Sequence, residues 1–209
     1  MSYKTAWFMS HRIREAMTTS PDGLLGSGGG AVEADEIYWG NSKRSKIGKL
    51  CADLRGAAAK EKIFSLVQRE GKVRTFHVQM VNAKTLKSVM DKYVAKDANL
   101  MTDEASYYKA IGREYASHGT TTHSLGQYVN GNMHLNTVEG CFSFLKRGLV
   151  GTFHHVEEQH LQPYCNEFDF RYNTRTALSF TDMARADLAL KGIAGKCLTY
   201  RRINGQQAA

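Results

Sequence analysis

The sequence predicts an α/β fold, with strands early in the chain and helices late. Residues 31–40, AVEADEIYWG, alternate in hydrophobicity and end at a glycine, as a strand does. Two β-rich runs follow at 61–70 and 72–81, and the Glu-Gly pair where they meet predicts a hairpin. Apolar side chains then recur at helical spacing over 83–96, before a short extended run at 98–105. Three strands, a helix and a fourth strand, with mainly helices behind them, define this class.

Residues 135–147 are expected to form a helix with one buried stripe. At about 100° per residue, four apolar side chains fall within about 60° of one another: Val138, Phe142, Leu145 and Leu149. Glu139 and Lys146 share a side about 100° away from this stripe and lie about 10 Å apart along the axis. This arrangement suits a metal-binding carboxylate beside a phosphate-binding lysine. The alternative is an ordinary solvated helix face.

Composition indicates a globular protein with a basic surface. The chain has 209 residues, 42% of them hydrophobic and 23% charged, which fits one soluble domain with a short appendage. It carries 28 Lys and Arg against 20 Asp and Glu, a net charge of +8. With a pI near 9.3, this balance favours a polyanionic partner such as nucleic acid.

The cysteines predict neither a zinc ribbon nor a redox pair, because no C-x-x-C pair is present. The four lie far apart: Cys51, Cys141, Cys165 and Cys197. We expect them to be reduced and structural, in a cytosolic protein. No apolar run approaches the roughly 18 to 20 residues that cross a bilayer, and the N-terminus lacks a signal-peptide pattern. A cytoplasmic location is therefore expected, nucleoid-associated when DNA is bound, with no membrane partner.

Shifts in composition divide the chain. Residues 2–17 place apolar side chains at helical spacing, whereas 18–30 combine a proline with several glycines, which is typical of a linker. We expect four segments: a helix within 1–18, a glycine-rich linker at 19–30, the main domain at 31–185 and a C-terminal tail at 186–209.

Acidic residues at strand ends are candidate metal ligands. Metal chemistry on phosphodiesters uses two divalent ions about 3.5 to 4 Å apart, which need more than one carboxylate. Asp35 stands inside the first strand, where a charge is costly unless it serves a ligand or ion, and Asp103 ends the fourth. The alternatives are a solvated acid for Asp35 and a helix cap for Asp103. Glu36 is expected to be the exposed neighbour of Asp35.

The spacing of these acids, with the motifs around them, resembles a known family. Between Asp103 and Glu139 lie 35 residues, and Lys146 follows seven positions later, like the D,D35E signature of transposases and retroviral integrases. The motifs VEADEIYWG, TDEASYY, HLNTVEGCFSFLKRGLVGTFHHV and EFDFRYNTR closely resemble prokaryotic insertion-sequence transposases of the ISXO type, which are related to the eukaryotic Merlin elements. The resemblance covers about residues 30 to 180, with the motifs in the same order.

This resemblance implies an RNase H-like fold, a mixed five-stranded sheet flanked by helices, with the DDE catalytic domain at 31–185. It also implies that Asp35, Asp103 and Glu139 hold two Mg²⁺ or Mn²⁺ ions for cleavage and strand transfer of DNA ends, with Lys146 on phosphate. We expect Glu139 to be the third ligand because of its charge and spacing, with Asn136, one helical turn before it, as a neighbouring metal ligand or its substitute. The alternative functions are an RNase H-like nuclease without strand transfer and a catalytically inactive DNA-binding remnant.

Basic side chains supply candidate DNA contacts. The helix within 1–18 resembles the last helix of a helix-turn-helix and indicates a truncated N-terminus. The expected contacts are Lys4, Arg12, Lys43, Arg44, Lys46, His134, Arg147, Arg171 and Arg175. A solvated loop is the alternative for 43–46, a structural hydrogen bond for His134, and an ion-paired helix for the last two. The expected partners are terminal inverted repeats and target DNA, bound by a homodimer or higher oligomer because two ends must be brought together.

Overall fold

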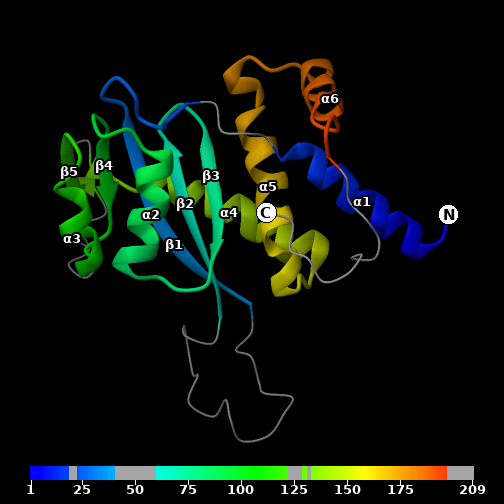
Figure 1. Ribbon diagram of the computed structural model, residues 1–209, viewed down its shortest axis with the longest axis horizontal. Coiled ribbons are helices and arrows are strands. Elements are labelled where there is room, and N and C mark those ends of the chain that lie inside the picture. The colour runs from blue at the N-terminus through cyan, green and yellow to red at the C-terminus, as the bar shows by residue number, and fades with distance from the viewer. Residues whose placement is uncertain (19–22, 41–59, 122–128, 131–132, 197–209) are drawn as a thin grey trace, which may run out of the picture.

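The computed structural model describes residues 1–18, 23–40, 60–121, 129–130 and 133–196. Five strands form one sheet in the order β3-β2-β1-β4-β5, so that β1 is central (Figure 1). β1 and β3 run antiparallel to β2, whereas β4 runs parallel to β1 and β5 parallel to β4. The strands are β1 (Ala31–Trp39), β2 (Glu61–Gln68), β3 (Val73–Val78), β4 (Asn99–Thr102) and β5 (Ser117–Thr120). The expected mixed sheet of an RNase H-like fold is confirmed.

The helices lie on both faces of this sheet and beside it (Figure 1). They are α1 (Tyr3–Met17), α2 (Ala83–Tyr93), α3 (Ser106–Gly112), α4 (Asn136–Gly148), α5 (Glu158–Asn173) and α6 (Asp182–Lys191), with the π-helical turn η3 (Leu149–Phe153) and the 3₁₀ turn η4 (Thr176–Leu178). A short ribbon of β6 (Val129–Asn130) and β7 (Met133–His134) precedes α4. The sequence did not indicate β5, because its four residues SHGT give no apolar alternation.

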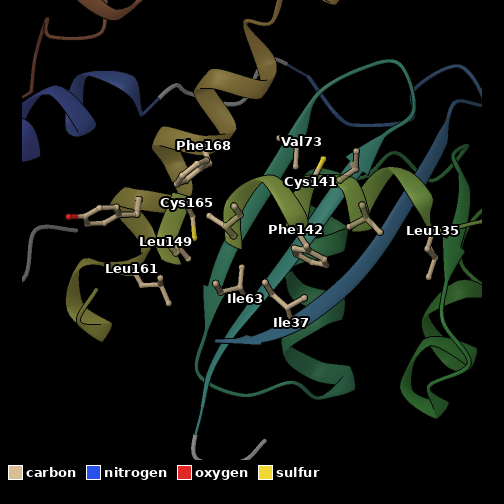
Figure 2. Close-up of a cluster of buried hydrophobic side chains, with 14 of the residues drawn as sticks. Ile37, Ile63, Val73, Leu135, Cys141, Phe142, Leu149, Leu161, Cys165 and Phe168 are labelled. Atoms are coloured by element: carbon tan, nitrogen blue, oxygen red, sulfur yellow. The ribbon is translucent and has the colours of Figure 1, made fainter. Parts of the chain in front are cut away.

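Two apolar cores bury the sheet. Successive residues of β1 point to opposite faces, so Ile37 packs with α4 and α5 while Ala34 packs with α2 and α3. Figure 2 shows the first core, where side chains of α4 lie over β1 and β2. The stripe expected on α4 is confirmed, since its four members are at most 4% exposed: Val138, Phe142, Leu145 and Leu149.

Two of the cysteines belong to the core of α4 and α5. Cys141 and Cys165 are buried free thiols (Figure 2). Burial raises the pKa of the Cys141 thiol to about 11, so this thiol stays protonated and unreactive at neutral pH. The expectation of reduced, structural cysteines holds for this pair, whereas Cys51 and Cys197 lie outside the described residues.

Helix α5 closes the outer edge of β3. The backbone amides at positions 73, 75 and 77 face away from the sheet, and side-chain oxygens of Asn173, Asp169 and Gln162 accept from them at 2.6 to 2.7 Å. Asn173 and Gln162 also donate to carbonyl oxygens of β3. Burial raises the pKa of Asp169 to about 7. Because an open strand edge can pair with another chain, these contacts both dock α5 and protect the sheet.

The described part of the glycine-rich stretch is built into the fold. Leu25 is 2% exposed, and its backbone bonds the carbonyl oxygen of Tyr93 and the amide of Ala95. Gly26 has a φ of +76°, and a Cβ there would stand 2.5 Å from the Cβ of Ala98. A glycine is therefore required where this segment passes the end of α2. Residues 19–22 lie outside the described part of the chain.

Helix α1 packs against α5 and α6, beside the sheet (Figure 1). Arg14 holds it there, because its Nε donates to Glu167 Oε2 at 2.8 Å while its guanidinium lies 3.9 Å from the ring centre of Tyr164. Both charged side chains are almost fully buried, and Arg171 also donates to Glu167. The segment boundary expected between 185 and 186 falls inside α6. Within the described ranges, no helix has the length and apolar character that a membrane span requires.

Replacing Arg14 with alanine is expected to release α1 from α5 while the sheet stays folded. The change removes one of the cations that balance the buried Glu167 carboxylate, and it removes packing on Tyr164. Together these losses are expected to weaken the attachment of α1 by about 2 kcal/mol. Hydrogen exchange of the α1 amides should accelerate with little change in β1 and β2. Arg12→Ala, at an exposed position of the same helix, is the control and should leave exchange unaltered. Equal exchange of α1 in both variants would contradict this role of Arg14.

Candidate active site

Asp35 and Asp103 occupy neighbouring positions on two parallel strands. β1 and β4 pair with Glu33 opposite Met101. Continuing this register by two residues sets Asp35 opposite Asp103, just past the carboxyl end of β4. Asp103 Oδ1 accepts from the amide of Ala105, ahead of α3, at 3.0 Å, so a local structural role accompanies its place at the strand end.

Glu139 enters the same site from the first turn of α4. Two consecutive residues of that turn, Thr137 and Val138, donate their amides to Glu33 Oε2, both at 2.9 Å. Glu33 and Asp35 lie on one face of β1, about 7 Å apart along the strand. The start of α4 is thus fixed above β1 beside Asp35, and Glu139 follows by one residue.

The charges of these acids act on one another. The pKa of Asp35 is raised to about 7, mainly by burial. The carboxylates of Glu36, Asp103 and Glu139 also raise it, whereas the hydrogen bond from the Glu36 amide lowers it. A carboxyl group in such surroundings holds its proton up to neutral pH unless a cation balances the site. Such mutual repulsion is consistent with a binding site for a divalent metal ion. Carboxylate oxygens bind such ions, and the positive charge would offset the repulsion.

Glu36 is not the exposed residue that the sequence led us to expect. It points to the other face of β1, where it accepts hydrogen bonds from the hydroxyls of Tyr107 and Tyr108, the latter at 2.7 Å. Burial raises the pKa of Glu36, the two hydroxyls lower it, and the charge of Asp103 raises it. Both tyrosines come from α3, directly after Asp103. Glu36 therefore ties the segment that carries Asp103 to the central strand.

Sequence reasoning missed Glu33 and Glu36 as parts of the site. The signal that selected Asp35, a charge inside an apolar strand, applies to both neighbours as well. What the sequence lacks is their partners: Thr137 and Arg69 for Glu33, and two tyrosines for Glu36. These residues lie between 36 and 104 positions away.

The other residues expected on α4 line one exposed side. Asn136 and Glu139 are exposed at its start, and Lys146 and Arg147 are exposed in its last turn. Lys146 lies two helical turns beyond Glu139, about 10 Å along the axis. Asn136 and Glu139 thus lie at one end of α4, and the two basic residues lie at the other.

The remaining candidates for DNA contact have varied surroundings. Lys4 and Arg12 are exposed on α1. His134 Nδ1 lies 3.5 Å from Glu33 Oε1, beneath the start of α4. Arg171 pairs with Glu167, as in the expected ion-paired helix, and Arg175 donates to two backbone carbonyl oxygens and lies over its neighbour Tyr172. Lys43, Arg44 and Lys46 fall outside the described residues. DNA contact by any of these side chains stays a prediction.

A second group of possible metal ligands lies elsewhere on the sheet. Among the residues that the structure describes, one group of three has its ligand atoms all within 4.8 Å: Glu61, His77 and Glu158. Glu61 precedes by four residues the Ser65 that pairs with Asp35, so this group stands about 13 Å along the strand from Asp35. His77 Nε2 lies 3.0 Å from Glu61 Oε2, a contact that joins β3 to β2.

The three expected metal ligands do not form so tight a group in the structure. Like-charged carboxylates repel one another when no cation lies between them. Glu139 is exposed on α4. The strand register sets Asp35 opposite Asp103, and binding of one ion by all three acids stays a prediction.

Comparison with known proteins identifies the family of this chain. The family model of the ISXO2-like transposase domain matches residues 27–173. That range holds all five strands of the sheet and the helices from α2 to α5. The chain belongs to this family of insertion-sequence transposases.

One relative comes from a mobile element. It is described as an uncharacterized protein in transposable element ISH50 of Halobacterium salinarum, and it is 27% identical over 187 residues. The alignment covers 82% of this chain and 60% of that relative. This chain is thus similar to a protein from a transposable element and spans a little over half of its length.

The raised pKa of Asp35 predicts a stability penalty that depends on pH. The pKa of Asp35 is about 7 in the folded protein, against 3.8 for an unperturbed aspartate, so stability falls as pH rises between these values. In metal-free protein we expect Asp35→Asn to raise the free energy of unfolding by about 1 to 3 kcal/mol at pH 8, with little effect below about pH 4. Urea unfolding at the two pH values measures this difference.

Asp169 has a similarly raised pKa and contributes a slope of the same sign. The relevant quantity is therefore the difference in the free energy of unfolding between wild type and Asp35→Asn at each pH. The Asp169 contribution is present in both proteins and cancels in this difference. A difference of the same size at pH 4 and pH 8 would show that burial and like charge do not act on Asp35 as described.

Proposed function

We propose that this chain is the catalytic domain of an insertion-sequence transposase that cuts the ends of its element and joins them to target DNA. The observation that supports the proposal is the register of β1 and β4, which sets Asp35 opposite Asp103, with Glu139 in the first turn of α4, the helix that packs over β1. Burial raises the pKa of Asp35, and the charges of Glu36, Asp103 and Glu139 also raise it. Two Mg²⁺ or Mn²⁺ ions held by these acids would supply a Lewis acid and an activated hydroxyl for attack on phosphate.

Each of the proposed site residues has a distinct role. Asp35, on the central strand, would hold a divalent ion as a carboxylate, because the cation would offset the like charges around it. Asp103 supplies a second carboxylate from the end of β4, while Tyr107 and Tyr108 of the following helix hold Glu36. Glu139 completes the set from the exposed side of α4, and Lys146 offers an ammonium to a DNA phosphate.

The proposed DNA path follows exposed basic residues of α4 and α1. Lys146 and Arg147 lie on α4 beyond the acids, and Lys4 and Arg12 are exposed on α1. A positive surface beside the acids would hold the phosphate backbone independently of base sequence. Bringing two element ends together calls for at least two copies of the chain, so we also propose a dimer or higher oligomer on DNA.

Cleavage is expected to depend on Asp103. Asp103→Asn keeps the size of the side chain but removes one of the charges that hold the metal, so metal-dependent nicking of DNA that carries the element's ends should fall about a thousandfold. Asp97→Asn is the matched control, since Asp97 is exposed at the opposite end of β4. Nicking of a labelled duplex in Mn²⁺ measures both variants. Equal rates in wild type and Asp103→Asn would refute the assignment.

Variants on α4 decide which side chain is the third ligand. Glu139→Gln is expected to lower the cleavage rate about a thousandfold, whereas Asn136→Ala should cost less than about tenfold, because only the carboxylate brings charge to the cation. The reverse order would transfer the role to Asn136. Both residues are exposed in the first turn of α4, so the comparison keeps any effect on folding small.

Strand transfer is tested separately from cleavage. A supercoiled plasmid target, incubated with pre-cut element ends and Mn²⁺, should acquire covalently joined ends. Nicking without joined products would assign the chain to the nuclease class with the same acids. DNA binding without Mn²⁺ binding or nicking would assign it to the catalytically inactive class.

A further inference from the structure

We propose that Glu33 is a positioning residue, which sets the place of Glu139 by capping the start of the catalytic helix α4 from the central strand. Glu33 itself is 0% exposed and lies beneath that helix. It touches neither substrate nor metal in this proposal, which rests on the proposed function only for the role of Glu139.

Three hydrogen-bond donors of α4 converge on the Glu33 carboxylate. The amides of Thr137 and Val138 donate to Oε2, and the hydroxyl of Thr137 donates to Oε1, each at 2.9 Å. The first amides of a helix have no partner within the helix, and the residue before α4, Leu135, offers no side-chain cap. A negative charge at a helix start is also favoured by the helix dipole. Glu33, on β1, therefore accepts hydrogen bonds from the first amides of α4, as the residue before a helix does in most helices.

The charge of Glu33 is balanced inside the same cluster. Arg69 Nε lies 2.6 Å from Glu33 Oε1, and Arg69 Nη2 donates to the carbonyl oxygen of His134 at 2.9 Å. The imidazole of His134 also lies beside Glu33. Arg69 thus holds both the carboxylate and the backbone that leads into α4. The helix start is fixed from β1 through Glu33 and from the hairpin through Arg69.

The contacts of Glu33 fix the position of α4 relative to β1. Glu33 and Asp35 share one face of β1, and Glu139 follows directly after the capped residues Thr137 and Val138. A change in the length or charge of residue 33 would therefore move Glu139 relative to Asp35. A shift of about 1 Å in a catalytic group is enough to lower a rate severalfold to a hundredfold.

A second buried glutamate in the chain provides a matched control. Glu167 is 5% exposed and bonded to Arg14 and Arg171, but it joins α1 to α5 rather than β1 to α4. Glu33→Gln and Glu167→Gln are the same substitution in similar surroundings. Both are expected to lower stability, and only Glu33→Gln is expected to alter the site.

The experiment compares these two variants and wild type as full-length chains. Hydrogen exchange of the first-turn amides of α4, measured without metal, should accelerate at least tenfold in Glu33→Gln and stay as in wild type in Glu167→Gln. The Mn²⁺ concentration that gives half-maximal cleavage should rise about tenfold in Glu33→Gln, with the KM for DNA unchanged. Thr137→Val, which removes one donor and no charge, should shift both readouts in the same direction by about threefold and serves if Glu33→Gln does not fold.

The outcomes separate this proposal from the function on which it rests. Unchanged exchange at the start of α4 in Glu33→Gln and Thr137→Val, or the same metal requirement in Glu33→Gln and Glu167→Gln, would overturn the positioning role. Absence of cleavage by wild type would overturn the proposed function. The exchange data would then still decide whether Glu33 fixes the start of α4.

Discussion

Three carboxylates lie in a four-residue stretch of the central strand, inside a sheet that is buried on both faces, and each must be compensated. Glu33 is compensated by the start of α4 and by Arg69, and Glu36 by two tyrosine hydroxyls of α3. Asp35 receives the amide of Glu36 and otherwise faces the charges of Asp103 and Glu139. Glu33 and Glu36 thus bind the elements that surround the strand. Asp35 remains in an environment that is unfavourable for its negative charge, and a bound cation would offset this.

The rest of the fold gives this strand a rigid setting. α5 satisfies the outward amides of β3, and α1 is attached to α5 through the buried pair of Arg14 and Glu167. The sheet edge on this side is therefore covered, and the apolar cores fix α4 on one face and α3 on the other. Membership of the ISXO2-like transposase family gives this arrangement its context, because in the proposed function a rigid scaffold holds the ligands and exposed basic residues meet the DNA.

Much of the architecture followed from periodicity. Alternation marked β1, the hairpin signal separated β2 from β3, and the buried stripe of α4 fell on the expected four residues. β5 was missed because four polar or small residues carry no period, and it forms only because β4 offers it a parallel edge. The glycine-rich stretch has the composition of a linker, yet Leu25 packs against the end of α2, a contact that composition does not encode. The exposed state expected for Glu36 was wrong, since the tyrosines that bury it lie more than 70 residues away.

The sequence by itself determined the class of fold, the catalytic family that it resembles and the acids worth testing, because strand alternation, helix period and motif spacing are local properties of the chain. Tertiary structure alone decided what surrounds each acid. Only the parallel register of β1 and β4 sets Asp35 opposite Asp103, and only the packing of α4 over β1 turns Glu33 into a cap. A pKa depends on burial and on charges within a few ångströms, and these are distances that residues far apart in the chain acquire only on folding.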